Sequence, residues 1–567
     1  MAPPSGMPRI LPPAPPEEES LRRELARAIQ GPMFVADLLL QRGIRDKEAA
    51  RAFFLPEPAP DSGPLLGLDR AVALLREARA RGEKVAVHGD YDVDGVTGTA
   101  LLFQGLMGLG FDATWYLPNR FEGGYGLSRR SLDALAERGA RWVVSVDTGT
   151  SAREEIAYAR ERELRVIVTD HHQAPEVLPD AEAIVNPNQP GCPYPNKGLS
   201  GCGVAWRLLE ALTGPGDPDP ARYLDLLALG SLADNVPVTG ENRALLRAGL
   251  RRMASPSNLG MRVLLQRVGI DPAAITTTDL LFKATPLLNA MGRMGSPEIS
   301  LRLFLSGSES EAHACVDKME AENKKRRKLD QAITAEAVAR VEGDPALREA
   351  PCLVLHSESW HEGVIGIVAA RLVDRYRRPA FVLAADGAGR FKGSGRTVPG
   401  FHLHKAISGC SGLFEKWGGH AFACGFTLPA ERIPEFRAAM EETARIYLAG
   451  GPRPAEVSPA VQVDLADLDA DSLLWLRRFE PFGPKNEAPV FYAEDVDLEG
   501  EARTVGEKHL KFSVKRRGLV FDAIAFNLGH LAGWMREREN LSRLAFYPEW
   551  NSFRGAKRIQ LRVAAME

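Results

Sequence analysis

Short apolar runs alternate with longer helical patterns between residues 65 and 240. Three of these runs, at 85–87, 143–146 and 166–168, are rich in valine and isoleucine. Strands that alternate with helices in this way are typical of a parallel sheet covered by helices. The pattern therefore predicts an α/β domain in the first half of the chain.

The pattern changes after residue 300. Residues 309–341 form a long polar helical pattern, whose basic run at 324–328 is expected to be a solvated helix face. A second mixed α/β region follows, and a glycine- and proline-rich linker at 450–454 separates it from a region of short strands. We divide the chain into a disordered or helical N-terminal extension (1–45), a first α/β domain (46–300), a connecting helix (301–345), a second α/β domain (346–450) and a β-rich domain (455–567).

Composition indicates a globular protein of several domains. The chain has 567 residues, of which 45% are hydrophobic and 26% charged, and its net charge is −3. These values exclude a fibrous or wholly disordered chain and a uniformly basic nucleic-acid coat. The six cysteines form no CxxC pair, which favours a reduced cytoplasmic protein over a disulfide framework or a structural zinc site.

The sequence predicts neither a signal peptide nor a membrane span. The first twenty residues are rich in proline and then acidic, without a sustained apolar core. The most apolar stretch, 99–110, is too short to span about 30 Å of hydrocarbon, so we expect a buried helix there. We expect no membrane association.

Acidic and histidine residues follow each of the three apolar runs. In an open parallel sheet, the carboxyl ends of the strands meet at one crevice, where ligands bind. Three separate segments would therefore bring their polar side chains together, and Asp234, after a helical run at 224–232, could add another carboxylate. The three segments read His88-Gly-Asp90-Tyr-Asp92-Val-Asp94-Gly, Asp147-Thr-Gly and Thr-Asp170-His171-His172.

Such a concentration of carboxylates predicts bound cations. The carboxylates cannot all ionise in one cleft unless cations neutralise them. Carboxylate and imidazole ligands without thiolates suit Mn²⁺ or Mg²⁺, and two ions bridged by one aspartate would use all of them. The alternative is that these are turn residues at strand ends, where Asp and Gly are common. That interpretation is the better one for any single segment, but not for all three together with a His-His pair.

These motifs resemble the DHH phosphoesterases. HGDYDVDG, DTG, DHH and ADN occur in the order of that superfamily's four motifs. Further segments resemble its RecJ branch, and the similarity extends from about residue 40 to the end. These segments are LPNR (117–120), GYGL (124–127), LNAMGRMG (288–295), GGHAFACG (418–425), PFGP (481–484) and PVF (489–491). The sequence departs from the family pattern at 484–487, where the usual GxGNP-like segment reads PKNE.

The resemblance implies an α/β fold with two lobes, DHH and DHHA1, a long connecting helix and a C-terminal β-barrel of the OB type. It also implies a metal-dependent exonuclease that degrades single-stranded DNA in the 5′→3′ direction to 5′-mononucleotides, in DNA repair and recombination. DNA with a free 5′ end would be the substrate, and single-strand-binding protein and a helicase are compatible partners. We expect a monomer.

The resemblance also assigns metal ligands. His88, Asp92 and Asp147 would hold one Mn²⁺, with Mg²⁺ as the alternative ion. Asp94, His171 and Asp234 would hold the second together with Asp147, which would bridge the two ions and act in catalysis. Asp90 is outside this pattern and could orient His88 instead.

Other residues are assigned to the substrate. His172 would lie beside the scissile phosphate, as a proton donor or phosphate contact. A terminal phosphate is expected to be bound by an arginine or a glycine-rich turn, although a solvated surface is the commoner place for any one arginine. The substrate-binding candidates are Arg120, Asn289, Arg293, Ser394, Arg396 and His420.

The last domain is expected to hold the strand. Residues 501–567 carry 13 basic and 7 acidic side chains, whereas residues 451–500 carry 4 basic and 11 acidic ones. A basic β-rich module with aromatic residues can follow phosphates and stack bases, although we expect at least half of the aromatic residues to be buried. The aromatic residues in question are Phe512, Phe546, Tyr547, Trp550 and Phe553.

Two other functions are compatible with parts of this pattern. A DHH phosphoesterase acting on pyrophosphate or very short nucleotides would share the metal ligands, but it would not need the basic last domain. A non-catalytic DNA-binding scaffold is a weaker alternative, because all six expected metal ligands are present.

Overall fold

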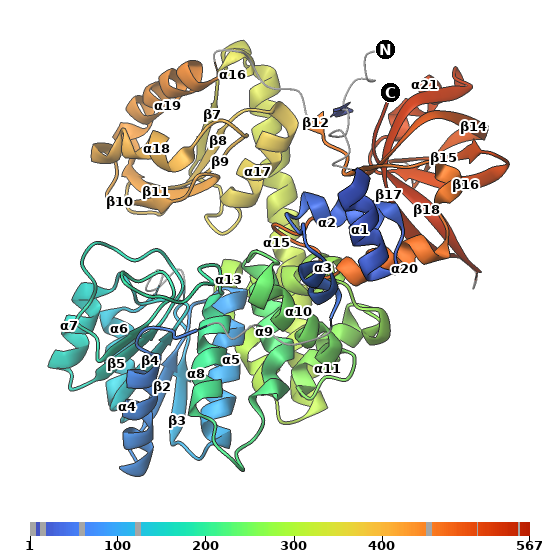
Figure 1. The fold of residues 1–567 in the computed structure, drawn as a ribbon. Helices are drawn as coiled ribbons and strands as arrows, with labels where there is room; N and C mark the ends of the chain where they lie inside the picture. Colours follow the sequence, from blue (N-terminus) through green and yellow to red (C-terminus); the bar gives the residue numbers. More distant parts are fainter. Residues whose placement is uncertain are drawn as a thin grey trace.

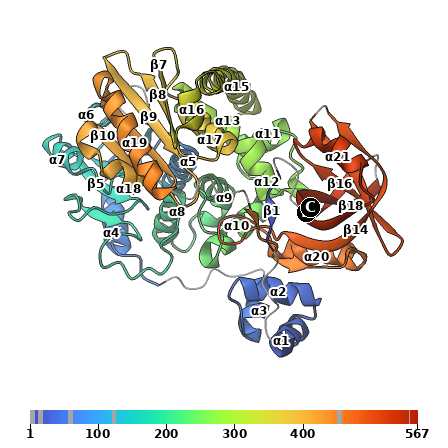
Figure 2. The same ribbon diagram turned by 90° about the horizontal axis from the view of Figure 1, so that it is seen from above.

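The computed structural model describes residues 7–11, 19–55, 63–119, 126–448, 456–506, 508–553 and 556–567. Two α/β lobes lie one above the other, and a β-barrel lies beside them (Figure 1). Figure 2 shows the same arrangement from above, with the barrel set apart from the stacked lobes. None of the described helices is long and apolar enough to cross a membrane. The fold class predicted from the sequence is confirmed.

The first lobe is built on a parallel sheet with the strand order β3-β2-β4-β5-β6. Successive side chains of a strand point to opposite faces, so the apolar runs serve two cores. Val87 and Val144 pack against α4, α5 and α8, whereas Ala86 and Val143 pack against α6 and α7. The elements are β2 (Val85–His88), β3 (Ala113–Tyr116), β4 (Trp142–Val146), β5 (Arg165–Thr169), β6 (Ala183–Val185), α4 (Leu68–Ala80), α5 (Val93–Gly108), α6 (Arg129–Glu137), α7 (Arg153–Glu161) and α8 (Gly201–Leu212).

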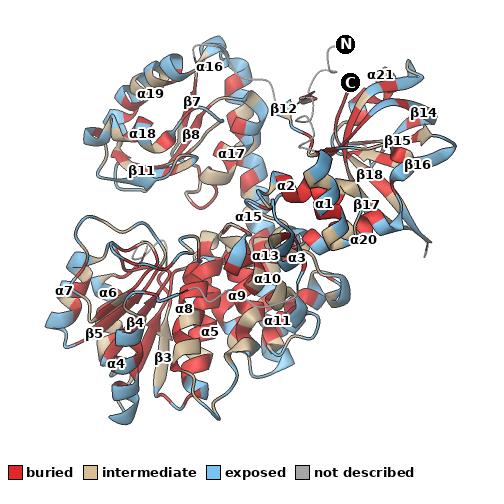
Figure 3. Ribbon diagram, in the orientation of Figure 1, coloured by how far each residue is buried: buried red, intermediate tan, exposed pale blue. Residues whose placement is uncertain are grey.

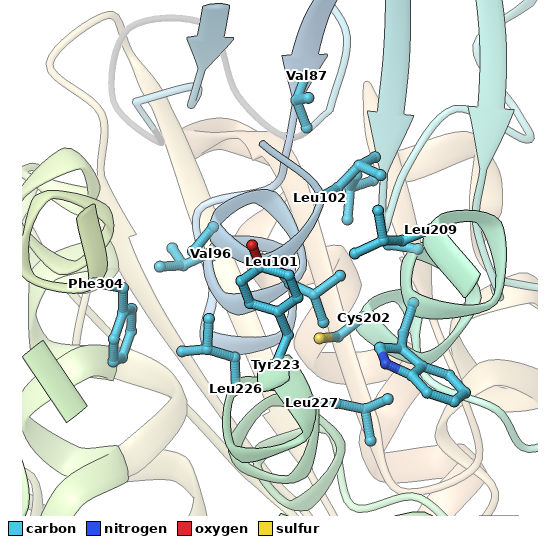
Figure 4. Packing of buried hydrophobic residues seen from close by; sticks show 14 of the residues in the cluster. Val87, Val96, Leu101, Leu102, Cys202, Leu209, Tyr223, Leu226, Leu227 and Phe304 are labelled. Carbon is cyan, nitrogen blue, oxygen red and sulfur yellow. The ribbon is translucent and has the colours of Figure 1, made fainter. Parts of the chain in front are cut away.

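Helix α5 is the centre of this lobe. It is buried over most of its length, as predicted for residues 99–110, and packs between the sheet and the helices that follow (Figure 3). Figure 4 shows Leu101 of α5 among Cys202 of α8 and Leu226 of α9. The helices after the sheet are α9 (Leu224–Ala233), α10 (Gly240–Met253), α11 (Leu259–Arg267), α12 (Thr277–Asp279), α13 (Thr285–Met294) and α14 (Pro297–Leu305), with one π-helical turn at Leu280–Ala284.

A single helix, α15 (Glu309–Gly343), joins the two lobes, as the polar helical pattern predicted. Its buried Asp330 accepts a hydrogen bond from Arg371 of the second lobe at 2.7 Å, which ties the two together. The second lobe has a five-stranded sheet in the order β10-β11-β9-β8-β7. Its elements are α16 (Pro345–Glu349), β7 (Leu353–Ser357), α17 (Ile365–Tyr376), β8 (Ala380–Ala385), β9 (Arg390–Arg396), α18 (Leu403–Ser408), β10 (Lys416–Gly419), β11 (Ala423–Pro429) and α19 (Ile433–Tyr447).

The barrel closes because β14 pairs with both β15 and β17, in the ring β14-β15-β16-β18-β17. Its core is shared with α1–α3, which come from the opposite end of the chain. The domain limits predicted from the sequence stay predictions. Residues 19–54 pack against the barrel and share its core. The elements are β1 (Arg9–Ile10), α1 (Glu19–Ile29), α2 (Met33–Gln41), α3 (Lys47–Phe54), β12 (Glu456–Val457), β13 (Val461–Gln462), α20 (Ala470–Phe479), β14 (Phe491–Val505), β15 (His509–Arg516), β16 (Leu519–Ala525), α21 (Ala532–Arg536), β17 (Asn540–Phe553) and β18 (Ala556–Met566).

A buried arginine fastens the barrel unit to the first lobe. Arg243 of α10 donates hydrogen bonds to the carbonyls of Phe53 at 2.8 Å and Arg478 at 3.0 Å. Its guanidinium carbon also lies 3.9 Å from the centre of the Phe53 ring. Burial and neighbouring arginines lower the pKa of Arg243 to about 9. The contact therefore joins α10, α3 and α20 in one place.

Candidate metal centre

The ends of β2, β4 and β5 bring the predicted acidic and histidine residues together. Since these strands are parallel neighbours, their carboxyl ends meet at one edge of the sheet. Three groups of side chains have ligand atoms within 4.8 Å of one another. The groups are Asp94 with His171 and Asp234, Asp147 with His171 and His172, and Asp90 with Asp92 and Asp147.

Asp94 is held by the start of α8. Its carboxylate accepts hydrogen bonds from the backbone N–H groups of Gly201 at 2.7 Å and Cys202 at 3.1 Å. A Cβ on Gly201 would lie 2.6 Å from Asp147 Oδ1, so only glycine lets α8 approach this closely. The N-terminus of the helix stabilises the negative charge through its unpaired N–H groups.

Asp147 belongs to two of the three groups, as His171 also does. It follows β4 in the left-handed region with φ of 63°, and it is buried. Its Oδ1 lies 3.1 Å from His171 Nε2 and 3.9 Å from His172 Nδ1. On the other side of His171, Nδ1 lies 3.8 Å from Asp234 Oδ2. The role of Asp147 as a ligand that bridges two ions stays a prediction.

The electrostatics of the cluster favour a cation. Burial and the charge of Asp92 raise the pKa of Asp94 to about 7. Burial and the charges of Asp94 and Asp92 raise the pKa of Asp234 to about 8, and the pKa of Asp147 is also raised by burial and the neighbouring carboxylates. Burial lowers the pKa of His171 to about 4, which leaves a neutral imidazole. A neutral imidazole among crowded carboxylates fits a divalent cation with oxygen and nitrogen ligands.

His88 lies outside these three groups, although it is fully buried. Neither of its ring nitrogens has a hydrogen-bond partner in the described part of the chain, and its ring stacks on Tyr116 at 5.3 Å. Burial lowers the pKa of His88 to about 4, so its imidazole is also neutral. Asp90, which the sequence left outside the ligand pattern, lies within one group. The assignments of His88 as a metal ligand, and of Asp90 as a residue that orients His88, therefore stay predictions.

Asp170 is a functional candidate that the sequence analysis did not single out. Its carboxylate accepts hydrogen bonds from Thr150 N and His171 N and lies 2.7 Å from His172 Nδ1. These contacts overcome the effect of burial and hold the pKa of Asp170 below its usual range. In turn, although burial opposes it, the contact with Asp170 raises the pKa of His172 to about 9. The signal was present in the sequence, because Asp170 directly precedes the His-His pair.

The substrate-binding candidates fall into two sets. Asn289 and Arg293 lie on α13 of the first lobe, whereas Ser394 and Arg396 lie on β9 of the second. Arg396 Nη1 donates to Ser394 Oγ at 3.1 Å, and burial lowers the pKa of this arginine. His420 is exposed in the turn between β10 and β11. Arg120 lies outside the described residues.

The predicted aromatic residues of the barrel differ in exposure. Phe512 and Phe546 are buried in its core, whereas Tyr547 is half-buried and Trp550 is exposed. Arg562 stacks on Tyr547, with 4.0 Å between its guanidinium carbon and the ring centre. The side chain of Phe553 lies outside the described residues.

The fold and the acidic cluster are those of a two-lobed DHH phosphoesterase with an added OB barrel. Family models match in three places: the DHH family N-terminal domain at residues 84–231, the DHHA1 domain at 349–445 and the RecJ OB domain at 460–565. The single-stranded-DNA-specific exonuclease RecJ of Salmonella typhimurium is 36% identical, over 88% of this chain and 89% of the relative. The chain belongs to the RecJ family of single-stranded-DNA-specific exonucleases.

Other relatives agree with this assignment. RecJ of Bacillus subtilis is also 36% identical, over 88% of this chain, and the match spans 63% of the relative's length. The crystal structure of RecJ from Thermus thermophilus in complex with Mn²⁺ matches 99% of this chain and 79% of its own, with a TM-score of 0.84 and 31% identity. The same relative in complex with Mg²⁺ matches 98% of this chain and 78% of its own, with a TM-score of 0.77 and 30% identity.

Proposed function

We propose that this chain hydrolyses single-stranded DNA from its 5′ end, releases 5′-mononucleotides with the help of two divalent cations, and acts in DNA repair and recombination. The observation that carries the proposal is the convergence of Asp94, Asp147, Asp234 and His171 at the carboxyl edge of the first sheet. A second lobe with a half-buried arginine on β9 and an OB barrel beside both lobes support a nucleic-acid substrate. Membership of the RecJ family supports the choice of DNA.

The acidic cluster would hold the cations. Asp94, Asp147, His171 and Asp234 would bind one ion, and Asp92 with Asp147 and either His88 or Asp90 would bind the other. Mn²⁺ or Mg²⁺ bound there would neutralise the carboxylates, polarise the phosphate and lower the pKa of water enough to supply hydroxide near neutral pH. The crystal structures of the Thermus relative with either ion support this choice of metals.

His172 would donate a hydrogen bond or a proton at the scissile phosphate. Asp170 holds its Nδ1, and the raised pKa keeps the ring protonated at neutral pH. The imidazolium would then donate from Nε2 to a phosphate oxygen, or pass its proton to the departing 3′-oxygen of the 5′-terminal nucleotide. Either role stabilises the negative charge that develops as the bond breaks.

The second lobe would select the end of the strand. Arg396 and Ser394 lie side by side on β9, and a guanidinium can clamp a terminal phosphate with two parallel hydrogen bonds. A phosphate fixed there sets which phosphodiester reaches the metal centre, so hydrolysis would release one nucleotide at a time. His420 would approach the substrate from the β10–β11 turn of the same lobe.

Binding partners and location stay predictions. A monomer in the cytoplasm, with single-strand-binding protein and a helicase as partners, is consistent with the proposed reaction. The exposed Trp550 and the Arg562–Tyr547 pair on the barrel would contribute to holding the strand, since aromatic and arginine surfaces stack on bases.

End-labelled DNA tests the proposed function. The protein is incubated with Mn²⁺ and a long single strand labelled at either the 5′ or the 3′ end, beside a blunt duplex. We expect immediate release of labelled mononucleotide from the 5′ label only, with the duplex intact. Asp147→Ala should fold but lose this activity, because it removes a carboxylate that belongs to two of the three groups. Release from the 3′ end, or cleavage confined to very short oligomers, would refute the proposal, and the latter would favour a small-substrate phosphoesterase.

A further inference from the structure

An exposed phenylalanine stands at the start of the helix that leads to the metal centre. Phe282 is 73% exposed, more than any other large apolar residue in the part of the chain that the structure describes. It belongs to the π-helical turn Leu280–Ala284, which continues directly into α13. π-helical turns are rare and are frequently found at functional sites. A single exposed apolar residue is common on a protein surface, so the residues that follow Phe282 along the helix decide what it contacts.

Phe282 is the first member of a stripe along this helix. Pro286, Asn289 and Arg293 follow at intervals of four, three and four residues, which is the spacing of one helix face. Each of the three is partly exposed, whereas Leu287, Leu288 and Met291 between them are buried in the core of the first lobe. The helix therefore presents one accessible stripe that begins with an aromatic ring and ends with an arginine.

The arginine end of the stripe lies at the metal centre. A Cβ on Gly292 would lie 2.7 Å from the carbonyl oxygen of Tyr91, in the loop that carries Asp90 and Asp92. A Cβ on Gly363 of the second lobe would lie 2.2 Å from the carbonyl oxygen of Arg293. The end of α13 is thus wedged between the metal-centre loop and the second lobe. Figure 1 shows α13 at the side of the first lobe that faces the second lobe, and Figure 2 shows α12 on the side of the barrel.

We propose that this stripe guides the DNA strand that follows the scissile phosphate, and that Phe282 stacks on one of its bases. The inference rests on the proposed function. Phe282 and Arg293 are separated by about 16 Å at 1.5 Å per residue. A stacked strand rises about 3.4 Å per nucleotide and an extended one roughly twice that, so Phe282 reaches a base about two to five nucleotides from the cleavage point.

Single-stranded DNA fits this stripe better than a protein does. Protein partners bury contiguous apolar patches, whereas Phe282 is followed by the exposed Lys283, whose ammonium group lies 2.7 Å from Asp279 Oδ1. An isolated aromatic ring among polar neighbours is what base stacking requires, because every base offers a flat face. The stripe also continues into residues already assigned to the substrate, namely Asn289 and Arg293.

Substrate length provides the test. KM and kcat are measured for Phe282→Ala on a 5′-phosphorylated dinucleotide and on a 5′-phosphorylated ten-nucleotide strand, with saturating Mn²⁺. We expect KM for the longer strand to rise about 5- to 150-fold, the range of one lost stacking contact. The dinucleotide should be cleaved as by the unmodified protein, since it does not reach Phe282. Phe282→Trp should restore the KM for the longer strand.

An abasic substrate separates stacking from other causes. Ten-nucleotide strands with one abasic site at nucleotide three, four, five or six from the 5′ end should identify one position where Phe282→Ala adds no further loss. Ile446→Ala serves as the matched control, because Ile446 is 67% exposed on the outer helix α19. An unchanged KM for the longer strand, an equal loss on both substrates, or additive losses at every abasic position would overturn the inference. If the unmodified protein does not degrade the strand from its 5′ end, the proposed function itself fails.

Discussion

Replacing Asp94 by asparagine should stabilise the metal-free protein at alkaline pH. The Asp94 carboxylate is buried beside Asp147, Asp92 and Asp234, and its hydrogen-bond donors include two backbone N–H groups of α8 and the Ser200 side chain. Asparagine has nearly the same shape and removes the charge. Its carbonyl oxygen can still accept one of the two hydrogen bonds, so the packing at the start of α8 should be retained.

The expected size follows from the pKa of Asp94. A rise from 3.8 to about 7 corresponds to about 4 kcal/mol, since each pKa unit is worth about 1.4 kcal/mol. The folded state binds this proton more tightly than the unfolded state does, so the metal-free protein loses this stability as pH rises from about 4 to 7. Asp94→Asn avoids that loss but gives up about 1 kcal/mol for one hydrogen bond. The net gain is about 3 kcal/mol at pH 8, and it becomes a small loss near pH 4.

Thermal unfolding in EDTA, at pH 4, 6 and 8, measures this directly. The variant should unfold at a higher temperature than the unmodified protein at pH 8, and the difference should vanish and then reverse as pH falls. Adding Mn²⁺ should stabilise the unmodified protein by about 2.7 kcal/mol at one hundred times its Kd and the variant by much less. A variant that is less stable at pH 8 in EDTA would show that Asp94 carries no buried, repelled charge.

Three further predictions concern other parts of the molecule. Asp170→Asn should move the alkaline limb of the pH profile of kcat/KM to lower pH at fixed Mn²⁺, because it removes the partner that raises the pKa of His172. An alkaline limb that does not move would exclude His172 as the titrating acid. Arg396→Ala should reduce the preference for 5′-phosphorylated over 5′-hydroxyl ends about 10- to 150-fold in competition assays, whereas an unchanged preference removes this arginine from the phosphate site. Arg243→Ala should lower the free energy of unfolding in urea by on the order of 3 kcal/mol, because the carbonyls of Phe53 and Arg478 lose a donor that is itself buried. Arg247→Ala, one turn later at a half-exposed position, should cost less than half of that.

The metal centre was predictable because its residues directly follow strands. Once the runs at 143–146 and 166–168 are read as neighbouring parallel strands, Asp147 and His171 must meet at one edge. The choice between His88 and Asp90 could not be made in the same way. It depends on the conformation of the loop before α5, which strand periodicity does not determine. The sequence also did not predict the exposure of Phe282, since an aromatic residue in a helical pattern is usually buried.

The fold was predictable within each unit but not between units. Alternation of strands and helices predicts the first lobe, and the polar helical pattern predicts α15. The helices at 19–54 have apolar faces, but a sequence does not say which surface will cover them. Arg243 illustrates the same limit, because only the approach of Phe53 and Arg478 turns this surface-like residue into a buried contact.

The shared core of α1–α3 and the barrel has a consequence for synthesis on the ribosome. Residues 19–54 leave the ribosome before both lobes, yet their apolar partners lie at 461–566, and Ile10 N donates to Glu567 Oε1 at 2.9 Å. The two lobes between them can fold during translation, since each has its own core. The N-terminal helices cannot bury their apolar faces until the barrel strands have been synthesised. Assembly of the third unit therefore comes after both lobes have been synthesised, and until then the nascent N-terminal segment is a natural target for chaperones.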